Sequence, residues 1–224
     1  MPNAVTTKRS SNAAGITAVG IDVGGERKGF HAVAITNGAY SSLLATKDVQ
    51  ELSLWCREKV RARVIAIDAP CRWSKDGHSR PAEKQLMQKG IWCFSTPTRA
   101  MAVGHRTNHF GWMLRGEELF QSLSGDFPLC RDLPVAGRKC CFETFPHAVT
   151  WHLQDGSADA SQKHQQRREL LKRANIDQTK LTNIDLIDAA LCALTAYYAA
   201  MGKDCAAFGE PDTGLIIVPK RQML

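Results

Sequence analysis

The arrangement of short apolar runs along the chain restricts its possible folds more than any other pattern in the sequence. Three runs that suit antiparallel strands come first, at residues 16–22 (ITAVGID), 29–36 (GFHAVAIT) and 39–46. Asn37-Gly38, between the second and third runs, is a strong signal for a tight hairpin turn. A predicted helix over residues 49–60 follows, and the entirely apolar run 64–67 (VIAI) is typical of a strand buried in a parallel sheet. This order predicts an α/β fold with a mixed sheet.

The second half of the chain continues the alternation of strands and helices after a long irregular segment. Residues 71–137 have no clear period, and we interpret them as a helical insertion or lid. Beyond this segment we predict strands in residues 139–144 (KCCFET) and 209–219, and helices in residues 146–154, 160–174 and 183–201. No internal repeat or linker divides the sequence. We therefore predict a flexible tail over residues 1–15 and a single domain over residues 16–224.

The composition is that of a globular protein with a basic surface. Hydrophobic residues make up 44% and charged residues 23% of the 224 residues, which excludes a disordered, collagen-like or coiled-coil chain. No apolar run approaches the roughly 20 residues of a membrane span, and residues 1–15 lack the apolar block of a signal peptide. We therefore expect a cytoplasmic protein with no membrane partner. The net charge of +7 favours nucleic acid as the partner, and the sequence leaves the oligomeric state open.

Acidic residues recur at one structural position, the end of an apolar run just before a turn. Asp22, Asp68 and Glu143 each occupy this position. Sites in open α/β sheets form beyond the carboxyl ends of the strands, so Asp22 and Asp68 would emerge side by side if their strands are parallel neighbours. Adjacent carboxylates repel one another unless a cation lies between them, and oxygen ligands of this kind suit Mg²⁺ or Mn²⁺. We therefore expect a divalent-cation site at this edge of the sheet.

Two further acids lie on the predicted helix over residues 183–201. Asp185 and Asp188 are three residues apart and therefore share one face of that helix. Asp188 is followed by two alanines, which indicates that it faces the protein, whereas Asp185 can equally be an N-terminal acid that complements the helix dipole. A turn or capping role is likewise the alternative for any single acid at a strand end. That alternative weakens when four acids share the arrangement.

Several segments of the chain, taken in order, resemble the ribonuclease H-like superfamily. These segments are GIDVGG, AIDAP, FETFPHA, IDLIDAALCALTAY and GLIIVP, and they span nearly the whole chain after residue 15. More narrowly, the chain is similar to the domain-of-unknown-function family four-two-nine, whose members are described as predicted ribonuclease H-like nucleases. The resemblance implies a five-stranded mixed sheet, in the order 3-2-1-4-5, that is flanked by helices. The 71–137 segment departs from this pattern, because the superfamily core lacks such an insertion.

The resemblance also implies which residues do the chemistry. By position, it implies catalytic roles for Asp22, Asp68, Glu143 and Asp188, and it implies metal ligation by Asp22, Asp68, Asp185 and Asp188. In the implied mechanism two Mg²⁺ ions, roughly 3.5–4 Å apart, bridge a scissile phosphate, and Asp22 bridges both ions. The expected function is therefore metal-dependent hydrolysis of nucleic acid, either DNA or RNA.

Basic and aromatic residues are candidates for contacts with the substrate. We expect phosphate contacts from three arginines of the 71–137 segment, Arg72, Arg80 and Arg99. For Arg80 the alternative is a surface ion pair with Glu83, three residues later. His147 can orient the substrate or act as a general base, and a structural role is its alternative. The tryptophans of the segment can stack on bases or pack in the core, namely Trp73, Trp92 and Trp112.

Two other functions fit parts of the sequence. IDVGG also resembles the phosphate loop of actin-like ATPases and sugar kinases, although 224 residues without a second loop of that type argue against their two-domain architecture. A non-catalytic nucleic-acid-binding module would keep the fold but would lack a carboxylate-dependent cation site. Because all the core acids are present, the sequence favours the nuclease over both alternatives.

Overall fold

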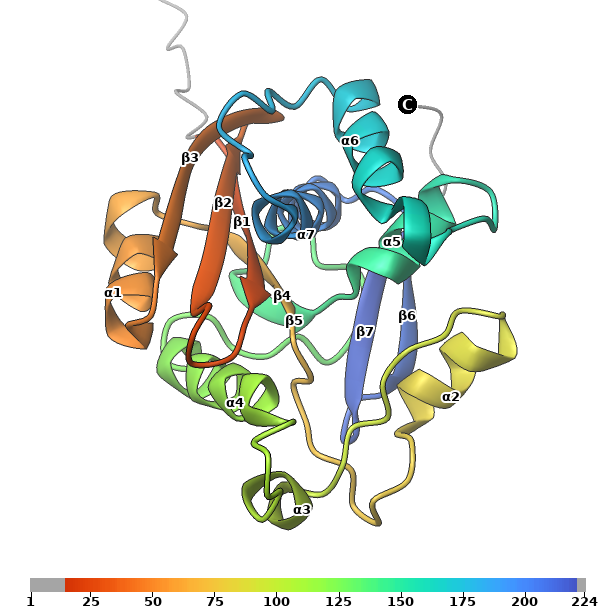
Figure 1. The fold of residues 1–224 in the computed structure, drawn as a ribbon. Helices are drawn as coiled ribbons and strands as arrows, with labels where there is room; N and C mark the ends of the chain where they lie inside the picture. The colour runs from red at the N-terminus through yellow and green to blue at the C-terminus, as the bar shows by residue number, and fades with distance from the viewer. Residues whose placement is uncertain (1–14, 221–224) are drawn as a thin grey trace, which may run out of the picture.

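A single mixed sheet forms the centre of the protein in the computed structural model, which describes residues 15–220 (Figure 1). Its strands are β1 (Thr17–Val23), β2 (Phe30–Thr36), β3 (Ala39–Thr46), β4 (Val64–Asp68), β5 (Cys140–Glu143), β6 (Cys205–Glu210) and β7 (Gly214–Pro219). They lie in the order β3-β2-β1-β4-β5-β7-β6. All but the last residue of the tail predicted over residues 1–15 lies outside the described residues.

The first five strands have the order and directions that the mixed α/β prediction requires. β1, β2 and β3 form two antiparallel pairs, and β4 and β5 run parallel to β1. Asn37 and Gly38 join β2 to β3, with positive φ values of 53° and 83°. Positive φ at both central residues is what a two-residue type I′ hairpin turn needs. The mixed α/β architecture is therefore confirmed.

The sheet is larger than the five strands that we expected. β7 lies parallel to β5, and β6 is the antiparallel neighbour of β7 at the edge of the sheet. The prediction of a strand within residues 209–219 located β7, but residues 205–210 (CAAFGE) lack the β-branched residues that mark a strand in sequence. A turn between Glu210 and Thr213 returns the chain along β6, so tertiary pairing outweighs the weak strand propensity of this segment.

Helices cover both faces of the sheet. They are α1 (Val49–Leu54), α2 (Pro81–Gln88), α3 (Arg99–Val103), α4 (Gly111–Leu123), α5 (Pro146–Leu153), α6 (Lys163–Arg173) and α7 (Ile184–Ala200), with a π-helical segment (Trp55–Lys59) after α1 and a short 3-10 segment (Ala160–Gln162) before α6. One apolar core lies between the sheet and α5, α6 and α7, and a second lies between the sheet and α1 and α4 (Figure 1). No helix among the described residues has both the length and the apolar character that a bilayer crossing requires.

The 71–137 segment packs against the sheet at both of its ends. At one end, the side chain of Gln85 in α2 accepts a hydrogen bond of 2.7 Å from the backbone N of Gly209 in β6. At the other end, Leu119 and Leu123 of α4 are buried in the same core as Ile21 of β1. The predicted insertion is therefore joined to the layers of the fold and does not stand apart from them.

Gly20 of β1 allows α7 to lie very close to the sheet. A Cβ atom on Gly20 would lie 1.9 Å from the backbone N of Ala193 and 2.1 Å from the carbonyl O of Ala189, far inside contact distance. The close approach brings the start of α7 to the carboxyl end of β1. As a result, the charges of Asp185 and Asp188 act directly on the acid at the end of β1.

Replacing Gly20 by alanine is expected to destabilise the protein by about 1–3 kcal/mol, because the new methyl group overlaps backbone atoms of α7. Urea unfolding followed by circular dichroism measures the change in unfolding free energy. Gly25→Ala is the matched control, because a Cβ atom at Gly25 has no other atom within 4 Å. Equal unfolding midpoints for the two variants would contradict the close packing of α7 on β1.

Candidate functional site

Asp22 and Asp68 lie side by side near the carboxyl ends of two parallel strands. Asp22 belongs to β1 and Asp68 ends β4, and the two residues are direct partners in the register of this strand pair. Both residues are half-buried. Neither carboxylate has an ion-pair partner within residues 15–220, although basic side chains neutralise other acids nearby. The fold therefore brings two uncompensated carboxylates together, as expected for acids that end neighbouring parallel strands.

The surroundings of these two carboxyl groups favour their protonated forms. Burial, followed by the negative charges of Asp188 and Asp185, raises the pKa of Asp22 to about 8. Burial also raises the pKa of Asp68 well above its ordinary value, and the charges of Asp22 and Asp188 add to the effect. Strongly raised carboxyl pKa values are frequent at functional sites. A divalent cation between the two groups would relieve the repulsion and favour their ionised forms.

Each of the two acids on α7 is held by a basic residue. Asp188 is only 7% exposed, and its Oδ1 accepts a hydrogen bond from Nη1 of Arg167 in α6. Arg167 is itself buried, so this pair is held firmly in place. Asp185 accepts hydrogen bonds of 2.8 and 2.9 Å from Nζ of Lys28, which lies between β1 and β2. The Lys28 side chain is 60% exposed, so the pair on Asp185 opens more easily than the pair on Asp188.

His31 joins these acids, although no pattern in the sequence singled it out. It lies directly opposite Asp22 in the register of β1 and β2. One ligand atom from each of Asp22, His31 and Asp185 lies within 4.8 Å of the other two. Nδ1 of His31 is buried without a hydrogen-bond partner among the described residues, and burial lowers the pKa of the imidazole. A lowered pKa favours the neutral imidazole, which is the form that binds metals.

These side chains have the chemistry of a divalent-cation site. We define the acidic site as Asp22, His31, Asp68, Asp185 and Asp188. Carboxylate oxygens suit Mg²⁺ and Mn²⁺, whereas an imidazole nitrogen suits transition metals. A cation held by Asp22 and Asp68 can therefore be either ion, and one that also uses His31 fits Mn²⁺ better than Mg²⁺. Ligation by Asp185 further requires the ammonium group that is bonded to it to move away.

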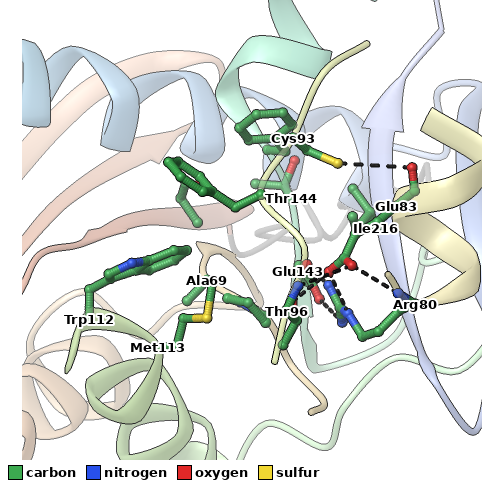
Figure 2. Close-up of a pocket in the computed structure, with 14 residues that line it drawn as sticks. Ala69, Arg80, Glu83, Cys93, Thr96, Trp112, Met113, Glu143, Thr144 and Ile216 are labelled. Atoms are coloured by element: carbon green, nitrogen blue, oxygen red, sulfur yellow. Dashed lines mark hydrogen bonds and ion pairs between the residues drawn. The ribbon is translucent and has the colours of Figure 1, made fainter. Parts of the chain in front are cut away.

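Glu143, the third acid at a strand end, is bonded within the protein. It is buried at the end of β5, and its two carboxylate oxygens accept hydrogen bonds of 2.7 and 2.9 Å from Arg80 (Figure 2). The backbone N of Cys71 donates a third hydrogen bond, at 2.8 Å. The catalytic role that the resemblance implies for Glu143 would require this network to open.

Arg80 is a part of this buried network and does not lie on the protein surface. It is 3% exposed, and its Nε donates a hydrogen bond of 2.8 Å to Glu83. Glu83 also accepts hydrogen bonds from the backbone N atoms of Arg80 and Thr96. The ion pair between Arg80 and Glu83 that the sequence suggested therefore exists, but it is buried and not on a helix surface. This placement does not support the predicted contact of Arg80 with a substrate phosphate.

The other predicted substrate contacts differ in how accessible they are. Arg72 follows β4 and is exposed. Arg99 begins α3 and is also exposed, and its Nε lies 2.9 Å from a carboxylate oxygen of Glu117. His147 of α5 is half-buried, and burial, followed by the positive charge of Arg167, lowers its pKa. Arg72 and Arg99 are therefore accessible to a substrate phosphate, whereas His147 is less exposed than either arginine.

The raised pKa of Asp22 predicts a pH-dependent stability for the metal-free protein. The folded state binds the Asp22 proton more tightly than the unfolded state does, so stability falls as the pH rises from about 4 to about 8. Asp22→Asn should remove this loss and be more stable than the wild type by at least about 1.4 kcal/mol at pH 8, the equivalent of one pKa unit. Urea unfolding in EDTA at pH 5 and pH 8 measures the difference. A stability difference that does not grow with pH would contradict the raised pKa.

Comparisons with known proteins identify the family of the chain. A family model described as a protein of unknown function (DUF429) matches residues 20–213. Comparisons with curated proteins and with solved structures found no match. The matched range covers most of the chain and includes every residue of the acidic site. The chain therefore belongs to the DUF429 family.

Proposed function

We propose that this protein is a metal-dependent nuclease with a ribonuclease H-like fold, which hydrolyses phosphodiester bonds of nucleic acid at the acidic site. The observation that carries the proposal is the pairing of Asp22 and Asp68, in register on adjacent parallel strands, with no ion-pair partner within residues 15–220. Carboxylates on rigid strands hold their oxygen atoms in fixed positions. Fixed oxygen ligands are what Mg²⁺, with its strict octahedral geometry, needs.

The topology of the sheet supports the proposed fold. The first five strands lie in the order β3-β2-β1-β4-β5, the order that the resemblance to the superfamily implies. The acid-bearing helix α7 packs directly on β1, which lies in the middle of these five strands. β7 and β6 extend the sheet beyond β5 and lie away from Asp22 and Asp68.

The proposed mechanism assigns a task to each residue of the acidic site. Bound Mg²⁺ or Mn²⁺ would lower the pKa of the attacking water and stabilise the leaving oxygen. Asp22 and Asp68 would hold a cation between the ends of β1 and β4. Asp188 would add a carboxylate ligand from α7, with its orientation held by Arg167. The guanidinium of Arg167 would also favour the negative charge that develops on the phosphate.

A second cation would be held by His31 and Asp185 together with Asp22. His31 and Asp185 provide ligand atoms within 4.8 Å of each other and of a carboxylate oxygen of Asp22. Lys28 neutralises Asp185 and would have to leave before that carboxylate could bind a cation. Asp22 would thus belong to both proposed sets of cation ligands.

A cleavage screen tests the proposal. Labelled single- and double-stranded DNA and RNA are incubated with the protein at low salt, with Mg²⁺, Mn²⁺ or EDTA. We expect at least one substrate to be cleaved with Mg²⁺ or Mn²⁺, and none with EDTA. Asp68→Asn should remove this cleavage. Asp212→Asn is the matched control and should cleave as the wild type does, because Asp212 is exposed and forms only a surface ion pair.

Other outcomes of the screen would contradict the nuclease. Cleavage in EDTA, or an Asp68→Asn variant that still cleaves, would show that the acidic site does not carry out the reaction. Hydrolysis of ATP without nucleic acid would favour the actin-like or sugar-kinase alternative. Nucleic-acid binding without cleavage, and without cation binding at the carboxylates, would favour a non-catalytic module.

A further inference from the structure

A cavity of different chemistry adjoins the acidic site. Asp68 is one of its lining residues. Three aromatic residues from separate segments also line it, Phe94, Trp112 and Phe145. In Figure 2, Trp112 extends from α4 toward the cavity, and Arg80 lies on the opposite side.

Most of the polar side chains of this cavity are already bonded within the protein. Arg80 bonds to Glu83 and Glu143, and Glu83 in turn bonds to Thr96. Oγ1 of Thr144 donates a hydrogen bond of 2.8 Å to a backbone carbonyl of β7. A group that enters the cavity therefore meets mainly aromatic and aliphatic surfaces.

One aromatic ring of the cavity lies largely in water. Phe94 is 67% exposed, in the segment between α2 and α3, and its ring makes an edge contact with His109 at a centroid distance of 6.4 Å. Exposed aromatic surface is unfavourable in water, and exposed apolar patches on soluble proteins often mark binding sites. Trp92, two residues earlier, is 76% exposed but does not line the cavity.

The neighbouring surface carries the positive charge that a nucleic-acid backbone requires. Pro70 lines both this cavity and an adjacent one, whose lining includes Arg72, Trp73 and Glu117. Arg72 is exposed and forms no ion pair within residues 15–220. The indole N–H of Trp73 donates a hydrogen bond of 2.8 Å to Glu117, which holds this tryptophan in place. The cavity next to the one that contains Asp68 therefore offers an unpaired arginine to a phosphate group.

We propose that the cavity binds one unpaired nucleobase of the nucleic acid whose backbone crosses the acidic site. The preferred substrate is therefore single-stranded, or it carries a base that has left the helical stack. This inference rests on the proposed nuclease function, because Asp68 belongs to both the cavity and the acidic site. Every base can stack on an aromatic ring, since each base has a π face. Because most polar side chains of the lining are already bonded, the site should discriminate little between bases.

Binding measurements in EDTA test this inference without cleavage. Fluorescence anisotropy compares a labelled single strand of roughly 20 nucleotides, without self-complementarity, with the duplex formed by its complement. We expect the single strand to bind at least about fivefold more tightly than the duplex. Phe94→Ala and Trp112→Leu should each weaken single-strand binding by at least about fivefold and leave duplex binding unchanged. Phe94 is exposed, so its replacement should not disturb the fold.

The control variant and the substrates separate this inference from the nuclease proposal. Trp92→Ala should bind both nucleic acids as the wild type does, because Trp92 is exposed but lies outside the cavity lining. A wild type without preference for the single strand, or a Phe94→Ala variant that keeps that preference, would overturn the inference. Single-strand binding that depends on Phe94, in a protein that cleaves nothing with metal, would leave the cavity assigned and the nuclease refuted. Metal-dependent cleavage of the single strand at a subsaturating concentration, if Phe94→Ala leaves its rate unchanged, would support the nuclease and overturn the cavity assignment.

Discussion

Asp22→Asn is expected to reduce metal-dependent cleavage by at least about a thousandfold, which corresponds to several kcal/mol of lost transition-state stabilisation. Asp22 is the strand partner of Asp68 and also lies within ligand distance of His31 and Asp185. The substitution therefore affects both proposed cation positions at once. An amide carries no negative charge and is a weaker ligand than a carboxylate for a divalent cation. Initial cleavage rates on the substrate found in the screen, at saturating Mn²⁺, measure the loss.

Binding and stability measurements show whether the lost activity comes from the site itself. Asp22→Asn should be at least as stable as the wild type, and more stable at pH 8, because it removes a carboxylate that burial and neighbouring acids disfavour. Its affinity for Mn²⁺, measured by calorimetry, should fall by at least about tenfold, or about 1.4 kcal/mol. Asp212→Asn should retain both the rate and the affinity. Wild-type cleavage or wild-type Mn²⁺ affinity in Asp22→Asn would exclude the acidic site as the cation site.

Arg80→Met is expected to lower the unfolding free energy by about 3–5 kcal/mol, because it leaves two buried carboxylates without a cation. The guanidinium bonds to both oxygens of Glu143 and to Glu83. Burial disfavours the charge on Arg80, but the charge and hydrogen bonds of Glu143, together with the charge of Glu83, outweigh it and raise the arginine pKa above its ordinary value. Removing one partner of a buried ion pair lowers the unfolding free energy by much more than the intact pair contributes to it. Urea unfolding at pH 7 measures the effect.

The pH dependence and a second variant identify the cause of this loss. In Arg80→Met the unpaired carboxyl groups should bind protons more tightly when folded than when unfolded, so the variant should recover stability as the pH falls toward 5. Arg99→Met is the matched control, because Arg99 forms an exposed ion pair with Glu117. This variant should lower the unfolding free energy by less than about 1 kcal/mol. Equal losses in the two variants, or a loss in Arg80→Met that is constant with pH, would show that the buried charges do not cause the effect.

The predictions from sequence were most accurate where neighbouring residues decide the structure. The hairpin signal at Asn37-Gly38 and the apolar run that became β4 both depend on local turn chemistry and side-chain periodicity. The sequence allowed us to predict that Asp22 and Asp68 lie side by side, because parallel neighbouring strands end at the same edge of a sheet. β6 was missed because its residues have little strand propensity and pair only after β7 is in place.

Ion pairing and burial of charged residues were predicted less well. Residues 160–174 form a strongly basic segment in the sequence, yet Arg167 within it is buried against Asp188 on α7. His31 was overlooked because a single histidine in a strand has no distinctive pattern. Only the register of β1 and β2 sets it opposite Asp22.

Local sequence was thus sufficient for every strand except β6, for the hairpin and for the position of two acids at strand ends, because turn preferences and periodicity act between residues close in the chain. The tertiary structure alone decided which charged groups pair across long distances in the sequence. Arg80 and Glu143 are 63 residues apart in sequence, and no local pattern predicts that they form an ion pair. Electrostatic partners are selected by distance in space and by exclusion of water, and both depend on the complete packing of the chain.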